Sequence, residues 1–401
     1  MLLAGIIISF AFILTLVKFK KPIGIAITLG GILLALFAQI PFSKIIYLVL
    51  HTLIEVPTLE LVVTVILINI LSAAMDEYGV LEKMVDYLEK LFRSTKVLLF
   101  IFPSLLSTFT TTGSAIIAAP VIDSLGNKVG LTKPRKAAIN LYIRHAWYFV
   151  LPISIPLINA SYISNIPLVE LMKVQLPVAL ACLLAAYFVY IKPLKDREYI
   201  QNGETKNKII FNTLLYSSPL LVCILLVFWI PFYAALVPGI FLTYTIGVKK
   251  QAFKKVLLKS KNTNLILAVL GIMIFKNIIG NIPQIKTMIM QVIRFGIPLE
   301  LLTIAVTLII AYAVANPSLL VGMVYPLILP LASPAEQIPY AMLIFTVGFA
   351  AYFISPVHLC QALTNEYFGV STEELFKEYK ITFPVMFFSG LITFYVLRLI
   401  M

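Results

Sequence analysis

The sequence predicts an all-α polytopic membrane protein of about ten transmembrane helices plus two re-entrant hairpins, arranged as two inverted-topology repeats. Three observations lead to this fold class. The chain of 401 residues is 61% hydrophobic and only 12% charged. Uncharged runs of about 17–25 residues recur along it, and each is long enough to cross a hydrocarbon core of roughly 30 Å. The order of these runs then repeats at a spacing of about 205 residues, as in transporters built from internal repeats.

Ten of these runs are expected to span the bilayer, because each is apolar over the length that a spanning helix needs. The first, MLLAGIIISFAFILTLV, has its lysines after the apolar core and contains no small-residue cleavage site, so we interpret it as a span and not as a signal peptide. The ten spans lie at about 2–17, 22–40, 60–76, 134–158, 171–191, 209–229, 232–248, 264–280, 338–358 and 381–400.

Two further apolar stretches, 98–125 and 299–331, are too long for one straight helix and are interrupted near the middle by small or helix-breaking residues. We expect each to form a re-entrant hairpin of two half-helices, because backbone groups freed at a break need protein or water as partners. The tips hold Thr110, Thr111, Thr112, Gly113 and Ser114 in the first hairpin, and Asn316, Pro317 and Ser318 in the second.

The hairpin tips are the first candidates for a binding site. Their hydroxyls and freed carbonyls are suited to Na+, with Thr111, Thr112, Asn316 and Ser318 as possible ligands, and half-helix N-termini are suited to an anion. A structural alternative remains open, since small hydroxyl residues also let membrane helices approach closely.

Three pairs of segments define the repeat, at shifts of 204 to 206 residues. The sequence predicts repeat one at 1–192, a cytoplasmic linker at 193–208 and repeat two at 209–401. Five spans per half is an odd number, so the second half is expected to enter the membrane upside down. The matched segments are LEKMVDYLEKLF with IKTMIMQVIRF, TTTGSAIIAAP with NPSLLVGMVYP, and YFVLPISIP with YFISPVHLC.

The distribution of basic residues agrees with this topology. With both termini outside, the predicted cytoplasmic loops carry 24 of the 31 Lys and Arg residues, as the positive-inside rule requires of a cytoplasmic membrane protein. The net charge of +13 is thereby explained without a nucleic-acid partner. Cys182, Cys223 and Cys360 lack metal-ligand spacing and are interpreted as packing residues.

The spans that follow the hairpins supply the remaining candidates. Arg144 and His145 are ionisable residues inside a span, where a guanidinium is suited to bind a carboxylate, although Arg144 can also extend toward the headgroups. Lys276, near the end of its span, is expected to extend in that way. Proline breaks these spans and exposes backbone, so nearby polar residues are further candidates. These are Ser154, Asn159 and Ser161 after the first hairpin, and His358, Gln361, Thr364 and Asn365 after the second.

A helix before each hairpin, a polar hairpin tip and a proline-broken span, written twice in inverted orientation, resemble the ion transporter superfamily of divalent-anion/sodium symporters and gluconate-type permeases. Within it, the chain most resembles the membrane proteins of domain of unknown function family 401. In the symporter branch each tip carries a Ser-Asn-Thr triplet, whereas this chain has three threonines at the first tip and Asn-Pro-Ser at the second. The resemblance implies a homodimer in which a transport domain moves against a scaffold domain as an elevator.

The sequence therefore predicts a secondary active transporter for a small organic anion, a carboxylate or sugar acid, coupled to Na+ or H+. No Walker A motif is present, so an ion gradient is the expected energy source, and no other cofactor is expected. An enzyme is not expected, because Ser114 and His145 lack the G-x-S-x-G context and no H-E-x-x-H motif occurs. The alternatives are an ion channel, a cation/proton antiporter and, less favoured, an intramembrane hydrolase.

Overall fold

The structure is a computed structural model that describes residues 2–19, 21–92, 94–107, 114–196, 205–249, 251–356 and 358–400. Within these residues the regular secondary structure is helical throughout. Five helices are long and apolar enough to cross a membrane, which supports the predicted class of an all-α membrane protein, while ten spans and inverted orientation stay predictions. The five are Val56–Glu77, Leu168–Ile191, Lys206–Leu226, Thr263–Gly280 and Thr382–Ile400.

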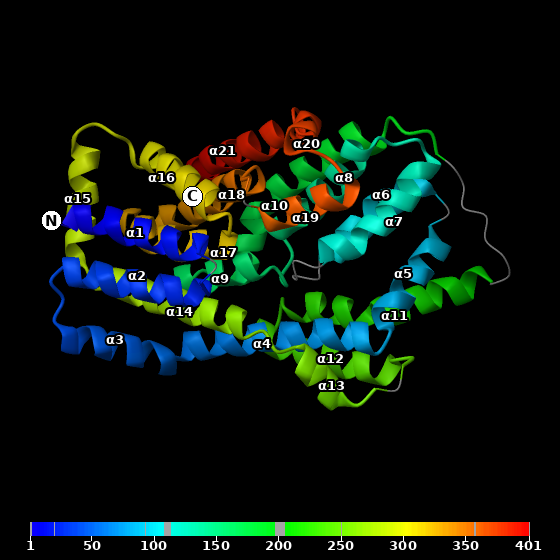
Figure 1. The fold of residues 1–401 in the computed structure, drawn as a ribbon, viewed down its shortest axis with the longest axis horizontal. Helices are drawn as coiled ribbons and strands as arrows, with labels where there is room; N and C mark the ends of the chain where they lie inside the picture. The colour runs from blue at the N-terminus through cyan, green and yellow to red at the C-terminus, as the bar shows by residue number, and fades with distance from the viewer. Residues whose placement is uncertain are drawn as a thin grey trace.

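The helices follow one another in the same order in the two halves of the chain (Figure 1). The first half contains α1 (Leu2–Lys18), α2 (Ile23–Phe37), α3 (Phe42–Ile54), α4 (Val56–Glu77), α5 (Val80–Leu91), α6 (Thr95–Leu106), α7 (Ser114–Lys128), α8 (Lys133–Ala146), η1 (Trp147–Phe149), α9 (Ile155–Ser164), α10 (Leu168–Ala186) and η2 (Tyr187–Ile191). The second half contains α11 (Lys206–Leu226), α12 (Phe232–Ile246), α13 (Phe253–Lys259), α14 (Thr263–Gly280), α15 (Pro283–Arg294), α16 (Leu299–Val314), α17 (Pro317–Ile328), η3 (Leu329–Leu331), η4 (Pro334–Glu336), α18 (Gln337–Phe353), α19 (Leu359–Phe368), α20 (Thr372–Glu378) and α21 (Thr382–Ile400).

Each stretch expected to form two half-helices does fold as two helices, α6 with α7 and α16 with α17. The two following spans, 134–158 and 338–358, were drawn as single spans and are corrected here. Each is two helices separated by non-helical backbone, α8 and α9 in the first case and α18 and α19 in the second. Prolines in both breaks remove backbone donors, which explains why the helices stop there.

Helix α3 is a second correction, because residues 41–59 were expected to be a loop. Its sequence, FSKIIYLVLHTLI, contains Lys44 and His51, so it does not form an uncharged run of spanning length. The helix is amphipathic instead: Ile45 and Leu48 are buried, while Phe42, Tyr47 and Leu50 are exposed. A 13-residue amphipathic helix fits a segment that packs on one side only.

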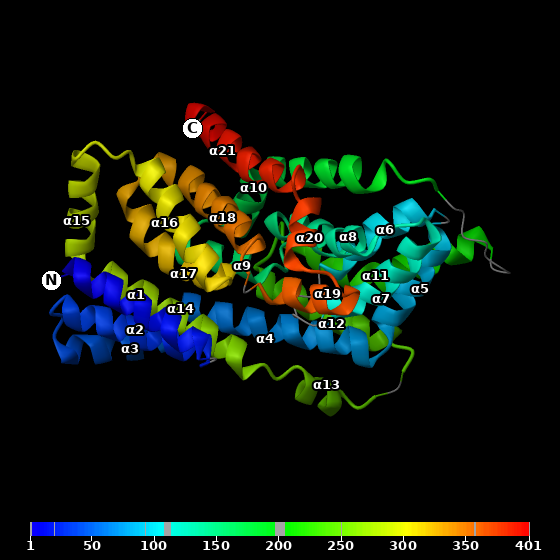
Figure 2. The same cartoon turned by 45° about the horizontal axis from the view of Figure 1, so that its top comes forward.

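The helices form two packing groups, each drawn from both halves of the sequence. The α14 group contains α1–α5 and α11–α14, and the α18 group contains α6–α10 and α16–α21. Within each group helices pack mainly on one another, and the main contacts between groups are α14 with α17 and α4 with α9. The α14 group occupies mostly the lower part of the view and the α18 group the upper part (Figures 1 and 2).

The closest packing within the α14 group joins α2 to α14. A Cβ on Gly24 would lie 1.8 Å from the carbonyl oxygen of Leu267, and one on Gly271 would lie 2.3 Å from the carbonyl oxygen of Gly24. Only glycine fits at these two positions, because any side chain would meet backbone. Small residues that permit backbone contact are typical of helix pairs in membranes, where dispersion contacts drive association.

Two helices at the centre of the α18 group are buried around their whole circumference. Every residue of α18 from Pro339 to Phe353 is buried, as expected for a helix that is apolar on all sides. Every residue of α8 from Lys136 to Ala146 is also buried, although it includes Asn140, Arg144 and His145. Burying such polar groups is costly, so a helix of this composition indicates a functional role for them.

Candidate functional site

Three helices begin at breaks in the centre of the molecule. Residue Ser154 is the N-cap of α9, Asn316 that of α17 and His358 that of α19. A helix N-terminus presents unbonded N–H groups and a partial positive charge, so three of them near one point favour an anion. The break before α17 also holds Ala315 in the left-handed region (φ 45°), a conformation that costs energy for a residue with a Cβ.

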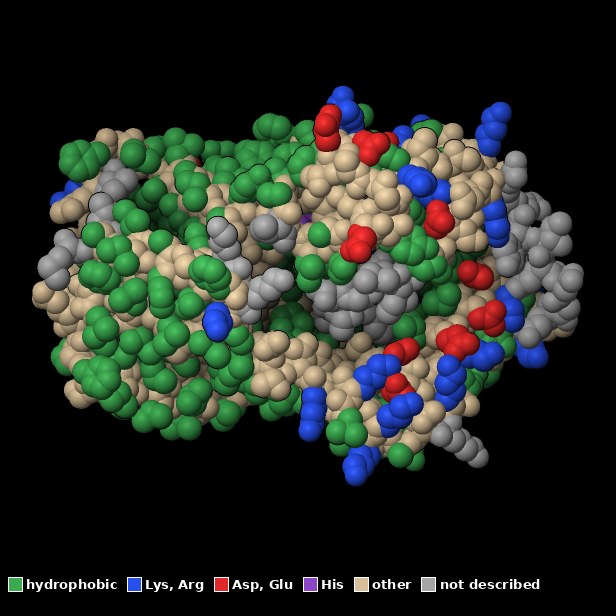
Figure 3. Space-filling model, viewed as in Figure 1, with side chains coloured by type: hydrophobic (Ala, Val, Ile, Leu, Met, Phe, Trp, Pro, Cys, Tyr) green, Lys and Arg blue, Asp and Glu red, His purple; other side chains and the backbone are tan. Residues whose placement is uncertain are grey.

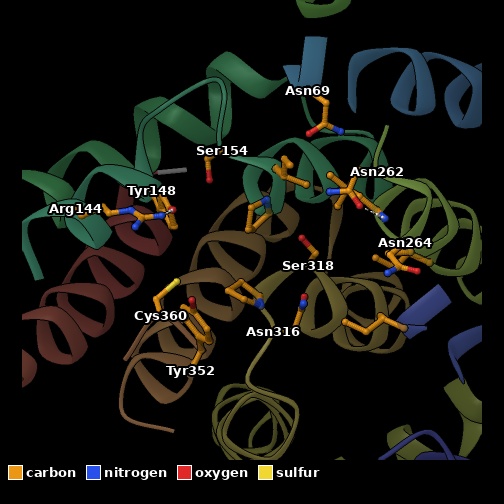
Figure 4. Close-up of a pocket in the computed structure, with 17 residues that line it drawn as sticks. Asn69, Arg144, Tyr148, Ser154, Asn262, Asn264, Asn316, Ser318, Tyr352 and Cys360 are labelled. Carbon is orange, nitrogen blue, oxygen red and sulfur yellow. Dashed lines mark hydrogen bonds between the residues drawn. The ribbon is translucent and has the colours of Figure 1, made fainter. Parts of the chain in front are cut away.

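A cavity of about 340 Å³ lies beside these N-termini, at the boundary between the α14 group and the α18 group (Figure 4). The α18 group supplies its charged and hydroxyl side chains, and the α14 group supplies three asparagines. The lining residues are Ile23, Asn69, Arg144, Tyr148, Ser154, Ile155, Pro156, Asn262, Asn264, Leu265, Ala268, Ile272, Asn316, Pro317, Ser318, Tyr352 and Cys360.

Arg144 brings a positive charge to this cavity from the last turn of α8. Its side chain is 1% exposed, so it does not extend toward the molecular surface as the snorkelling alternative required. Its Nη2 donates to the hydroxyl of Tyr148 at 3.1 Å. The described residues that line the cavity include no Asp or Glu, so this lining carries a net positive charge.

The candidates Ser154, Asn316, Pro317 and Ser318 line the same cavity, and their side chains surround one central space (Figure 4). The Oδ1 of Asn316 accepts from the N–H of Leu319 at 3.0 Å, so this side chain caps α17 as well as lining the cavity. The buried Ser154 hydroxyl has no hydrogen-bond partner among the described residues. An unsatisfied buried hydroxyl facing a cavity is suited to a ligand or an ordered water.

The other candidates lie outside the cavity lining. Thr110, Thr111, Thr112 and Gly113 lie outside the described residues, and Ser114 begins α7 without a described side chain. His145 and His358 are buried behind the wall, with ring centroids 5.0 Å apart. Asn159 and Gln361 are buried, Asn140 donates to Thr364 at 3.4 Å, Asn365 donates to Thr372 at 3.2 Å, and Ser161 donates to the carbonyl oxygen of Ile166 at 2.6 Å.

Lys276 does not extend outward as expected. It is partly buried, and its Nζ donates to the carbonyl oxygen of Tyr162 at 3.1 Å. Because Lys276 belongs to α14 and Tyr162 to α9, this bond joins the two packing groups near the cavity.

Six polar or sulfur-containing residues of the lining were not predicted: Asn69, Tyr148, Asn262, Asn264, Tyr352 and Cys360. A signal for two of them was present. Tyr148 and Tyr352 occupy the same position in the matched segments YFVLPISIP and YFISPVHLC, a match interpreted only as evidence of duplication. Asn69 is an isolated amide within an apolar span, which is also a recognisable signal.

Comparison with known proteins gives the family of this chain. No curated protein matches it. A family model described as "Protein of unknown function (DUF401)" matches residues 3–400, nearly the whole length. This match confirms the family part of the resemblance, and the chain belongs to the DUF401 family.

Proposed function

We propose that this protein is a secondary active transporter for a small organic anion, a carboxylate or a sugar acid. The observation that carries the proposal is the central cavity, on which the Arg144 guanidinium and the N-termini of α9, α17 and α19 converge. A guanidinium binds a carboxylate through paired hydrogen bonds, and helix N-termini add donors of the same polarity.

The cavity dimensions favour a small ligand. A volume of about 340 Å³ is near the lower end of the range of roughly 300–1,000 Å³ typical of small-molecule sites. Asn69, Asn262 and Asn264 offer amide donors and acceptors opposite the charged wall, which suits a ligand with hydroxyl groups beside its carboxylate.

Elevator transport is the mechanism that we propose, together with membership of the ion transporter superfamily and a homodimeric assembly. The cavity lies between two packing groups that contact each other through few helices, which is where a substrate must lie if one group moves against the other. The hydroxyls at the helix breaks are suited to Na+, and H+ is the alternative coupling ion.

The charged surface supports the proposed topology. Lys, Arg, Asp and Glu side chains gather over the half of the molecule that carries α5, α13 and α20, whereas the surface over α1–α3 is mostly hydrophobic (Figure 3). Those helices belong to loops predicted to be cytoplasmic. The Nζ of Lys259 on α13 lies 2.7 Å from Glu77, and its hydrogen bonds to Asp76 and Glu77 raise the pKa of Lys259 above its usual value.

Reconstituted vesicles provide the test. We expect concentrative uptake of at least one labelled carboxylate or sugar acid under an inward Na+ or H+ gradient, and no accumulation once the gradient is collapsed. Thermal-shift screening of the purified protein against carboxylates, amino acids and sugar acids, in Na+ and in K+, selects the ligand to label. Flux that only equilibrates across the vesicle membrane would identify a channel, and the absence of any anion-dependent stabilisation would contradict an anion site.

A further inference from the structure

Three metal-binding side chains meet behind the cavity wall, although nothing in their spacing along the sequence indicated a site. His145 lies in the last turn of α8, His358 is the N-cap of α19, and Cys360 lies in the first turn of α19. A ligand atom from each side chain lies within 4.8 Å of those from the other two, and all three side chains are buried. The break between α18 and α19 is what brings α19 back onto α8.

Both imidazoles are oriented by the backbone. The Nδ1 of His145 lies 2.7 Å from the carbonyl oxygen of Leu141, and the Nδ1 of His358 lies 3.3 Å from that of Phe353. A carbonyl oxygen only accepts, so each Nδ1 carries the proton and each Nε2 of the neutral ring has a free lone pair. A backbone carbonyl bound to one ring nitrogen is the usual support for a histidine that binds metal through the other.

The Nε2 atoms have few other partners. His145 Nε2 lies 3.5 Å from the hydroxyl of Tyr352, a long contact. His358 is 1% exposed, and its Nε2 has no hydrogen-bond partner among the described residues. A buried nitrogen acceptor without a partner is costly, so its presence beside a second histidine and a thiol needs a ligand to explain it.

The third donor, Cys360, lies between the two histidines and the cavity. It is 6% exposed and lines the cavity together with Arg144. A positive charge in the same lining favours the thiolate form of a cysteine, the form that binds metal. An ion held here would therefore keep an open position on the cavity side.

We propose that His145, His358 and Cys360 bind a borderline or soft transition-metal ion such as Zn2+, through two Nε2 atoms and one thiolate. This donor set selects zinc-class or copper-class ions over Mg2+ and Ca2+, which prefer oxygen. Bonds of about 2.0–2.3 Å place tetrahedral ligands roughly 3.3–3.8 Å apart, so small side-chain rotations close the site. Three protein ligands leave a fourth position for water or an anion.

Aromatic packing is the competing explanation for the two histidines. The His145 ring lies among Tyr148, Phe349 and Phe353, with centroid distances of 5.2 to 5.9 Å. Packing explains why these rings are buried, but it does not explain why a thiol and two Nε2 atoms face the same point.

Cobalt binding tests the proposal, because Co2+ replaces Zn2+ and gives a thiolate-to-metal charge-transfer band in the near ultraviolet. We expect the purified full-length protein, without a histidine tag and without organic anions, to bind one Co2+ per chain with this band, and Zn2+ to displace it. The band should disappear in Cys360→Ala. It should persist in Cys182→Ala and Cys223→Ala, which remove buried thiols elsewhere.

His358→Gln provides a second variant, in which Co2+ affinity should fall at least tenfold while the thermal unfolding midpoint of the metal-free protein stays near that of the wild type. Wild-type protein without the band, or a band that survives Cys360→Ala, would overturn the proposal and leave aromatic packing as the role of the histidines. Because binding is measured without any organic anion, failure here leaves the proposed transport function untouched.

Discussion

Replacement of Arg144 tests the proposed anion site most directly. In Arg144→Ala the ligand loses a charge-assisted hydrogen bond worth about 1.5–3 kcal/mol, which is roughly a ten- to hundredfold loss of affinity. In Arg144→Lys little should be recovered. The guanidinium is 1% exposed and already donates to Tyr148, and an ammonium cannot reproduce a planar group with several donors.

Isothermal titration of the purified variants with the anion found by the thermal-shift screen measures this effect. The unfolding midpoint without ligand is recorded for each variant, so that a folding defect is distinguished from a binding defect. Wild-type affinity in Arg144→Lys or in Arg144→Ala would remove Arg144 from the binding site and refute the reasoning that led to an anionic substrate.

Three further predictions concern the cavity, the helix packing and the topology. Ser154→Ala and Ser318→Ala should each weaken ion or anion binding by roughly two- to tenfold in titrations, with unchanged melting of the ligand-free protein, because the Ser154 hydroxyl has no partner among the described residues. Gly24→Leu should lower the unfolding midpoint, since its Cβ would meet the carbonyl oxygen of Leu267, whereas Gly280→Ala on α14 should not, because a Cβ added there would have no neighbouring atom within 4 Å among the described residues. In a cysteine-free background, Lys255→Cys should be labelled from the cytoplasm and Ala335→Cys from outside, and labelling of both from one side would contradict the inverted repeat.

The cavity residues that the sequence revealed are those that conflict with their local surroundings. Arg144 is a charge in a segment otherwise suited to the bilayer, and Ser154 and Asn316 stand where prolines end a helix. Such conflicts are visible without knowledge of the fold. The helix breaks themselves were predictable for the same reason.

The residues that were missed are acceptable where they stand and become part of a site only through packing. Asn262 and Asn264 lie at the start of α14, where an asparagine is an ordinary helix cap, and they reach the cavity because α14 packs on α17. Cys360 was interpreted as a packing residue from its spacing to the other cysteines. Its neighbour in space is His145, from the other half of the chain, and that contact depends on how α19 packs against α8.

The last prediction separates a residue that positions Arg144 from one that contacts the ligand. Tyr148 accepts a hydrogen bond from Arg144, while Tyr352 occupies the matching place in the second half and lines the same cavity. If Tyr148 acts through Arg144, then Tyr148→Phe should reduce anion affinity by roughly two- to tenfold in the wild-type background and have no further effect in Arg144→Ala. Tyr352→Phe is the control of equal chemistry, and its effect should be the same in both backgrounds. Additive losses for Tyr148→Phe and Arg144→Ala would show that Tyr148 does not act by orienting the guanidinium, whereas a double variant no weaker than Arg144→Ala alone would make the pair one unit of the anion site.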